Sequence, residues 1–455
     1  MFVEKIVGRS TEMSFLKQYY GMPGSQMVVV YGGKGVGKTE LLREFCKGKK
    51  SYYYLARACS EREQCCQWGG ELREKGIAVA KYPEYEELLA ASVMEKEPEK
   101  QPEKQVLVID EFHHMIKGAA GFFAKLAEFT ENRLMSRPVM VVLCTSASGW
   151  VENHLVGKIG SRAAVIGGFL KVRELGFTEM RRIFPQYKFE DCMRIYAVLG
   201  GIPGYWMSFQ SNLDARENII RNILAKESRL YGEMEVYLEQ ELREPGVYNT
   251  ILTAMARDCN KLNDIYRHTG FSRAKISVYL KNLMELDLVE KVYSYETEGR
   301  ANTQKGIYRI ANPYVRFYFR YLFPNRSMLQ LLSPEDFYDR KVAESYDLYV
   351  EEAYRRICRE HMGREYRAVG EWLGKTGVID IVASDGQEAV GVGICVWSRA
   401  MEYRDLEWLL FSMKKARIVS TDIRLYCEKG FDDVLRQKAE EGKVRLFGIR
   451  ESEGR

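Results

Sequence analysis

The sequence lacks any apolar run long enough to span a membrane, and its first ten residues, MFVEKIVGRS, lack the apolar core of a signal peptide. These absences argue against a membrane protein and predict a cytoplasmic location. The ten cysteines form no C-x-x-C pair, and none is accompanied by histidines at zinc-finger spacing. We therefore expect free thiols in a reducing compartment.

The sequence also contains few prolines and has little net charge for its length. The 455 residues include only 11 prolines, and the net charge is +5. A charge this small for the length gives no general argument for nucleic-acid binding, so any basic surface must be local. With 46% hydrophobic and 29% charged residues, the composition is that of an ordinary globular protein, and the length predicts about three domains.

What the sequence does contain is a phosphate-binding motif in residues 27–40, MVVVYGGKGVGKTE. Residues 27–31 predict a buried strand, residues 39–46 predict a helix, and the segment between them fits G-x-x-x-x-G-K-[ST] without a gap. Glycines let backbone N–H groups surround phosphate oxygens, and the helix N-terminus adds a positive dipole end. We expect Lys38 to reach the β- and γ-phosphates of ATP and Thr39 to hold Mg²⁺. The predicted nucleotide-binding residues are Gly32, Gly33, Lys34, Gly35, Val36, Gly37, Lys38, Thr39 and Glu40.

A second nucleotide motif follows at residues 106–111, where four apolar residues end in Asp110 and Glu111. A buried parallel strand would deliver both carboxylates to the sheet edge at which ligands bind. Asp110 is then predicted to fix the magnesium, and Glu111 to orient or deprotonate the water that attacks the γ-phosphate. His113 and His114 are interpreted as polar residues at a helix start.

Two further candidates are weaker. Ser146, with Thr145 as its substitute, follows the predicted strand 139–144 and would hydrogen-bond the attacking water or the γ-phosphate. A hydroxyl that caps the next turn explains it equally well. Arg162 precedes an apolar run and is a candidate for stabilising the transition-state charge, in cis or in a neighbouring subunit. A simple salt bridge is the alternative.

Residues 248–310 carry a winged helix-turn-helix pattern. Three helices are predicted at 248–256, 262–268 and 272–286, followed by strands at 290–295 and 306–310 around a polar tip. An apolar stripe of Ile276, Leu280 and Leu283 would bury one face of the third helix. The predicted DNA contacts are Arg273, Lys275, Ser277, Lys281, Arg300 and Lys305. Docking of a protein stays open, because neighbouring acidic residues weaken the positive field.

The order of these motifs resembles the archaeal-type ATPases of the AAA-like P-loop class. The resemblance rests on Val7-Gly8-Arg9, the phosphate loop, Asp110-Glu111, Ser161-Arg162, Gly200-Gly201-Ile202-Pro203, and the segments after it. It implies an α/β multidomain protein with a P-loop ATPase core (1–175), a helical lid (176–243), a winged helix-turn-helix (244–312), an aromatic bridging segment (313–345) and a restriction-endonuclease-like α/β domain (346–455). It also implies that Val7, Gly8 and Arg9 cover the adenine, although a purely structural role is equally open.

In active members of that nuclease-like fold, one strand carries an acidic residue and the next carries Glu-x-Lys. Asp380 stands at the first position, whereas Ile394-Cys395-Val396 stands at the second. Aliphatic side chains cannot ligate magnesium, so we predict a degenerate PD-(D/E)xK scaffold without nuclease chemistry. We expect it to dock a protein partner. A misalignment by one strand would leave nuclease activity open.

The sequence therefore predicts a cytoplasmic ATPase that uses ATP and Mg²⁺ to control binding of double-stranded DNA. By analogy with assemblies in which a neighbour supplies the arginine, a homo-oligomer is expected. Two alternatives remain: an ATP-gated regulatory switch for protein partners without DNA, and an ATP-dependent DNA nuclease.

Overall fold

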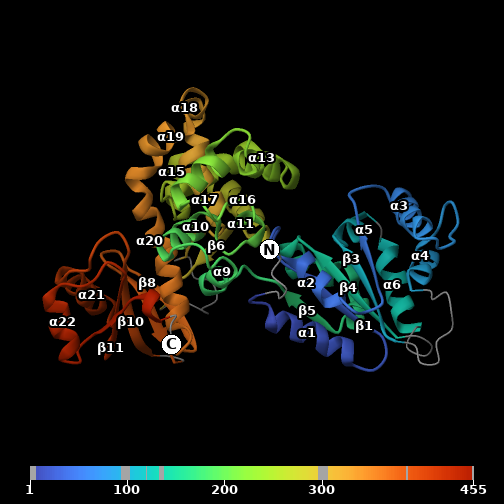
Figure 1. The fold of residues 1–455 in the computed structure, drawn as a ribbon, viewed down its shortest axis with the longest axis horizontal. Helices are drawn as coiled ribbons and strands as arrows, with labels where there is room; N and C mark the ends of the chain where they lie inside the picture. Colours follow the sequence, from blue (N-terminus) through green and yellow to red (C-terminus); the bar gives the residue numbers. More distant parts are fainter. Residues whose placement is uncertain are drawn as a thin grey trace. The chain divides into compact units, whose positions relative to one another are not determined.

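The fold is described from a computed structural model, which covers residues 7–93, 103–118, 120–132, 138–295, 306–385 and 388–452. The chain divides into two compact units, coloured along the sequence in Figure 1. Unit 1 comprises Met1–Leu175 with Ile202–Gly204 and Glu285–Asp287, and unit 2 comprises the rest. Within the described ranges, every helix is too short or too polar to cross a membrane.

Unit 1 is built on a five-stranded parallel sheet in the order β2-β3-β4-β1-β5. Its strands are β1 (Gln26–Tyr31), β2 (Ser51–Leu55), β3 (Gln105–Asp110), β4 (Val139–Thr145) and β5 (Gly168–Lys171). The central strands are continuous apolar runs, as expected of parallel strands that are buried on both faces. Tyr31 pairs with Thr145, and Leu55 pairs with Asp110. The carboxyl ends of β1, β3 and β4 therefore meet at one edge of the sheet.

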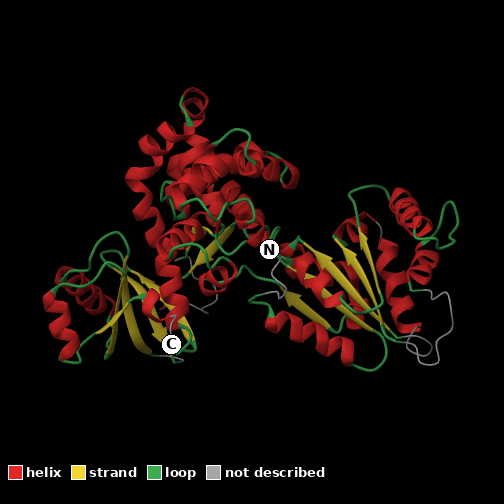
Figure 2. Cartoon of the chain, viewed as in Figure 1, coloured by secondary structure: helices red, strands yellow, loops and turns green. Residues whose placement is uncertain are grey.

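Helices cover both faces of this sheet, giving three layers (Figures 1 and 2). On one face, Leu16 of α1 (Ser10–Gly21) and Leu41 and Phe45 of α2 (Lys38–Cys46) pack on the valines of β1. On the other face lie α3 (Glu61–Glu74), α4 (Tyr85–Ser92), α5 (His113–Gly118) and α6 (Ala120–Asn132). The unit continues with α7 (Ser148–Trp150), η1 (Val151–Leu155), α8 (Val156–Ile159) and η2 (Gly160–Val165).

Unit 2 begins with short helices. These are α9 (Phe177–Ile183), α10 (Phe189–Leu199), α11 (Pro203–Trp206), α12 (Ala215–Ile219), η3 (Ile220–Leu224) and α13 (Arg229–Glu241). Residues 216–237, in the predicted helical lid, do not form one continuous helix. The backbone N–H of Ala225 bonds to the carbonyl of Ile220, which widens the last turn, and Ala225 itself is extended. The chain re-enters a helix only at Arg229.

The winged helix-turn-helix elements form as predicted. They are α14 (Pro245–Ala256), α15 (Leu262–Thr269), α16 (Arg273–Glu285) and the antiparallel pair β6 (Val289–Val292) and β7 (Ile307–Ile310). Gly270, at φ 71°, makes the left-handed turn that ends α15. Ile276, Leu280 and Leu283 are fully buried, which confirms the predicted stripe. Arg300 and Lys305 lie outside the described residues.

A bridging segment follows, consisting of α17 (Pro313–Phe317), η5 (Tyr318–Leu322), η6 (Phe323–Asn325), α18 (Arg326–Leu331), α19 (Pro334–Phe337) and η7 (Tyr338–Val342). It leads into the long helix α20 (Ala343–Met362). The aromatic residues Tyr314, Phe317, Tyr318, Phe319 and Tyr321 are all buried. The aromatic run is thus a structural core and not an exposed surface for stacking bases.

The C-terminal part is a mixed α/β domain with strand order β12-β11-β10-β9-β8. Strands β8 (Ala368–Leu373), β9 (Val378–Ser384) and β10 (Ala389–Val396) are antiparallel, whereas β11 (Asp422–Cys427) and β12 (Arg445–Phe447) run parallel to β10. Helix α21 (Tyr403–Ala416) packs on the sheet, and α22 (Asp433–Glu440) and α23 (Ile449–Ser452) complete the chain.

Candidate nucleotide site and candidate DNA-binding helix

The phosphate loop connects the end of β1 to the start of α2, and three of its glycines are dictated by geometry. Gly35 and Gly37 have φ of 81° and 98°, in the left-handed region that favours glycine. A Cβ on Gly32 would lie 2.1 Å from the carbonyl oxygen of Val172. Larger side chains at these positions would strain or displace the loop.

Lys38 is the first residue of α2, and its side chain is buried inside the loop. The ammonium Nζ donates to the carbonyls of Gly32 (2.8 Å) and Gly33 (2.9 Å). Thr39 and Glu40 are exposed in the first helical turn, where Glu40 pairs with Arg43. The positive N-terminal end of α2 and the Lys38 ammonium thus lie close together, which is the arrangement that binds phosphate.

Arg9 supports this loop. Its guanidinium is buried and donates to the carbonyl of Val36 (2.6 Å) and to Glu12 (2.8 Å). Val7 is half-buried, and Gly8 is exposed with φ of 73°. Of the two roles considered for Arg9, these contacts favour the structural one.

The acidic pair lies at the end of β3, as the sequence predicts. The Asp110 carboxylate is buried; its Oδ1 accepts the backbone N–H of Glu111 (2.9 Å), and its Oδ2 accepts the hydroxyl of Tyr53. Tyr53 lies on β2, and sequence reasoning missed it. The only available signal is the strand order, because β2 must lie beside β3 for the contact to form.

Glu111 is held in a strained turn. Its φ is 49°, which is uncommon for a residue with a side chain. Its Oε2 accepts the backbone N–H of Ser146 (2.9 Å) and the hydroxyl of Thr145 (3.2 Å), and lies 3.3 Å from His113 Nδ1. Burial opposes the charge, but the hydrogen bonds from His113 and Ser146 lower the pKa of Glu111 to about 2. The carboxylate is therefore ionised near neutral pH and can accept a hydrogen bond from a water, although the low pKa makes it a weaker base.

Thr145 and His113 complete the cluster around Glu111. Thr145 is fully buried, and its hydroxyl lies 2.7 Å from His113 Nδ1. Both Ser146 and Thr145, the alternative candidate to Ser146, therefore contact Glu111. Ser146 does so through its backbone N–H, and Thr145 through its hydroxyl. His113 begins α5, as interpreted, but its contact with Glu111 was missed; the two-residue spacing of the carboxylate and the imidazole was the available signal.

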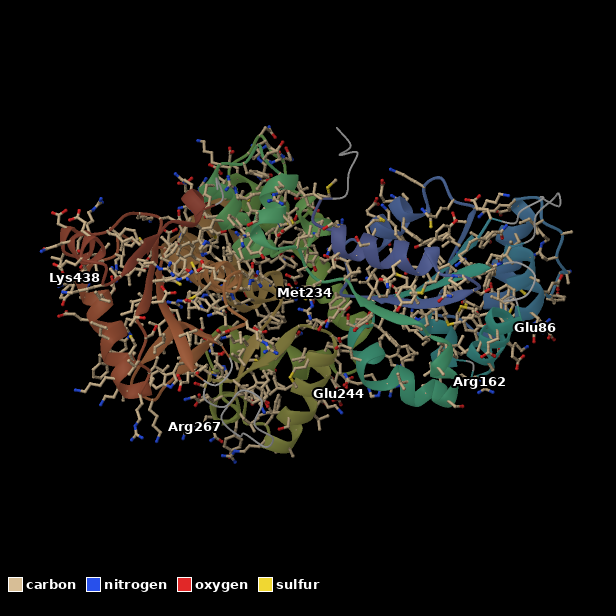
Figure 3. All side chains as sticks on the ribbon, turned by 90° about the horizontal axis from the view of Figure 1, so that it is seen from below. Glu86, Arg162, Met234, Glu244, Arg267 and Lys438 are labelled. Carbon is tan, nitrogen blue, oxygen red and sulfur yellow. The ribbon has the colours of Figure 1, made fainter. Side chains whose placement is uncertain are left out.

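Arg162 stands apart from this cluster. It is exposed on η2, and Figure 3 labels it at the surface of unit 1. Within the described part of the chain, no ion pair or hydrogen bond joins it to Lys38, Asp110 or Glu111. Its role as a charge stabiliser stays a prediction, and its exposure suits contact with a neighbouring subunit.

Helix α16 carries basic side chains on the surface that its buried stripe leaves exposed. Arg273, Lys275, Ser277 and Lys281 are all exposed. Arg273 is fixed by a hydrogen bond to Asn263 (2.7 Å) and lies 4.3 Å from the ring centre of Tyr266. These residues form a surface of cations and hydroxyls suited to phosphate and base edges.

Asp380 lies on β9, and its side chain is largely buried, with 13% exposed. Its Oδ2 accepts the backbone N–H of Cys395 (3.0 Å), and its Oδ1 is 3.2 Å from Arg355 Nε. Burial raises the pKa of Asp380, although Arg355 opposes the shift. Within the described residues, no three His, Cys, Asp or Glu side chains gather as a metal cluster.

Comparisons with known proteins agree with this arrangement. Residues 6–209 match the family model of an ATPase domain predominantly from Archaea. Residues 249–291 match that of a bacterial regulatory protein of the arsR family, and residues 318–408 match that of archaeal and bacterial proteins of unknown function. The phosphate loop, Asp110 and Glu111 lie inside the first match, and all of α16 lies inside the match to residues 249–291.

Individual relatives are distant. The chain is 23% identical over 429 residues to uncharacterized protein MJECL04 of Methanocaldococcus jannaschii, covering 91% of this chain and 93% of that protein. Among solved structures, it is similar to the Walker-type ATPase PABY2304 of Pyrococcus abyssi (16% identity, TM-score 0.49, 70% and 97% of the two chains). It is also similar to the ORC2 protein of Aeropyrum pernix (15% identity, TM-score 0.45, 73% and 96%), but TM-scores below 0.5 assign neither protein's activity to this chain. The comparisons thus show that residues 6–209, which contain both nucleotide motifs, are similar to an ATPase domain predominantly from Archaea.

Proposed function

We propose that this protein is a cytoplasmic ATPase in which ATP binding and hydrolysis control the binding of duplex DNA by α16. The observation that supports it most directly is the meeting of Lys38, Asp110 and Glu111 at one edge of the parallel sheet. This edge is where parallel α/β sheets bind ligands. The match of the surrounding residues to an ATPase domain supports the same reaction.

Each residue has a distinct task in this proposal. Lys38 and the loop amides bind the phosphates, and Thr39 and Asp110 offer oxygen ligands of the kind that Mg²⁺ prefers. The ion, when bound, neutralises charge that develops on the phosphate oxygens. Glu111 orients or deprotonates the attacking water, and its carboxylate is ionised for that purpose. Thr145, Ser146 and His113 position Glu111.

The DNA-binding part of the proposal rests on α16. Its exposed face combines Arg273, Lys275 and Lys281, and its sequence matches a family of regulatory proteins. A recognition helix of this kind enters the major groove and also contacts phosphates. Docking of a protein on the same helix is the competing outcome.

The test is ATP hydrolysis by the full chain with and without duplex DNA, beside Lys38→Ala and Glu111→Gln. We expect DNA to raise the rate, and each substitution to lower it by at least about a hundredfold, because each removes a charged group that acts on the reacting phosphate or water. A rate that ignores DNA at both low and high salt would reject the DNA coupling. Wild-type activity in both variants would reject the site itself.

We further propose that the C-terminal domain is a nuclease-like scaffold that does not cleave DNA. The support is the environment of Asp380, whose carboxylate is committed to Arg355 and to the backbone of Cys395. Incubation of labelled duplex DNA with Mg²⁺ or Mn²⁺ should leave it intact. Metal-dependent cleavage that Asp380→Ala abolishes would overturn this proposal.

A further inference from the structure

Unit 2 contains a cavity of about 380 Å³ whose wall is unusually rich in arginine. Five guanidinium groups contribute to its lining, from four elements that are separate in the sequence. They are Arg309 on β7, Arg316 on α17, Arg320 on η5, and Arg355 and Arg359 on α20. Four carboxylates also line it: Asp258, Glu352, Glu371 and Asp380. The predicted nucleotide site in unit 1 contributes no residue to this wall.

Two largely buried carboxylates organise these arginines. The Glu371 carboxylate accepts hydrogen bonds from both terminal nitrogens of Arg309, with a distance of 2.8 Å from Nη2 to Oε2. The same Oε2 lies 3.8 Å from Nη1 of Arg359. Arg359 also donates to the backbone carbonyl of Asp380 (3.1 Å), and Arg355 lies against the Asp380 carboxylate. Because a buried charge is costly unless it is paired, these contacts explain how so many cations share one wall.

The five guanidinium groups are not equally committed to these pairs. Arg316 donates to Glu352, and Arg355 pairs with Glu351 as well as with Asp380. Arg320 is held loosely, by the carbonyl of Ala256 (3.2 Å) and by Asp258 at 3.7 Å, and that aspartate side chain is 80% exposed. Arg320 is therefore the guanidinium group of the wall that is most available to a ligand.

The remainder of the lining is mostly apolar, apart from Asn260 and Tyr349. Met255, Ala256, Ile310, Leu348 and Val378 contribute to it, and Leu348 is 65% exposed. Ligand sites typically combine such apolar walls with a few convergent polar groups in a volume of this order. The cavity thus offers guanidinium groups for an anion and apolar side chains for a ring or sugar.

We propose that this cavity binds a small phosphate-bearing ligand of nucleotide size, held by the guanidinium groups. The planar fork of arginine matches phosphate oxygens bidentately, and arginine is weakly hydrated enough to act in a buried site. A divalent cation fits less well, because the carboxylates that could hold it are already paired with arginines. The ligand binds in the place where a nuclease would hold its metal, because Asp380 and Glu371 here hold arginines.

The experiment uses full-length protein carrying Lys38→Ala, so that the phosphate loop contributes little, and titrates it with AMP and with inorganic pyrophosphate by calorimetry. Arg320→Gln is the first variant, because this arginine is the one least tied to the fold. It should weaken binding about tenfold, as expected for loss of a charged hydrogen bond. Asp258→Asn should tighten binding about threefold, because it removes a facing negative charge. Asp258 has φ of 64°, which asparagine also tolerates.

Arg340→Gln is the matched control, since this exposed arginine on η7 lies outside the cavity and its loss changes the net charge equally. It should leave both affinities unchanged. Failure of both probes to bind, equal weakening by Arg320→Gln and Arg340→Gln, or weakening by Asp258→Asn would each overturn the proposal. Binding of a duplex oligonucleotide that is sensitive to Arg320→Gln, without binding of AMP or pyrophosphate, would also overturn it and would assign the wall to a nucleic-acid backbone.

Discussion

At the scale of single residues, Tyr53 is the side chain that most changes the view of the nucleotide site. Its hydroxyl donates to Asp110, the residue proposed to hold Mg²⁺, and the second carboxylate oxygen accepts from the backbone of Glu111. A metal that takes the carboxylate must compete with the hydroxyl. Tyr53 therefore affects how readily the Asp110 carboxylate can bind Mg²⁺.

Tyr53→Phe should lower the Mg²⁺ concentration that gives half-maximal ATP turnover. One hydrogen bond contributes about 1 kcal/mol, so a shift of about fivefold is expected. The measurement is turnover against Mg²⁺ at saturating ATP. Tyr52→Phe is the matched control, because Tyr52 is the preceding residue of β2 and its buried hydroxyl has no hydrogen-bond partner in the described chain. An unchanged or raised Mg²⁺ requirement in Tyr53→Phe would contradict the competition.

At the scale of elements, α16 is where the DNA-binding proposal is most open to measurement. Each lysine that contacts a phosphate displaces a counterion, so the salt dependence of binding counts such contacts. Lys275→Gln and Lys281→Gln should each reduce the slope of log Kobs against log salt by about 0.9. Fluorescence anisotropy with a labelled duplex at several salt concentrations measures it.

Lys414→Gln, an exposed lysine on α21, is the control for this slope and should leave it unchanged. If neither lysine of α16 alters the slope, α16 does not contact the DNA backbone. A protein partner would then be the better occupant of this helix.

Elements defined by nearby residues could be predicted from the sequence, and contacts between distant residues could not. The strand, glycine loop and helix around Lys38 form one uninterrupted stretch, and the stripe on α16 follows helical periodicity. The Tyr53–Asp110 contact instead depends on which strands are neighbours. The contact of His113 with Glu111 depends on a left-handed turn at Glu111. The arginine-lined cavity collects residues from Arg309 to Arg359 that share no motif.

At the scale of the whole molecule, the division into two compact units predicts two unfolding transitions. A ligand that binds only the folded form raises the free energy of unfolding by mass action. The increase is about 2.7 kcal/mol when the free ligand concentration is a hundred times its Kd. ATP with Mg²⁺ should therefore raise the midpoint of the unit 1 transition more than that of unit 2. Differential scanning calorimetry measures both midpoints.

Lys38→Ala should remove the ATP-dependent rise and leave the unit 2 midpoint in place. Trp68 and Trp150 lie in unit 1, and the tryptophans at 206, 372, 397 and 408 lie in unit 2. Tryptophan fluorescence of variants that keep the tryptophans of one unit only, with the others changed to Phe, would assign each transition to its unit. A single transition that ATP shifts as a whole would contradict independent unfolding.

The position of β1 in the middle of its sheet also governs how the chain is made. β1 ends at Tyr31, but β4, which pairs with one of its edges, begins only at Val139, and β5, which pairs with the other, begins at Gly168. At ordinary rates of translation, the nascent strand waits roughly 5 to 20 s for its first partner to leave the ribosome. Throughout that interval Val28, Val29 and Val30 lie on a strand without its partner strands, which makes this segment prone to aggregation during synthesis. Fragments that end before Val139 should aggregate during synthesis.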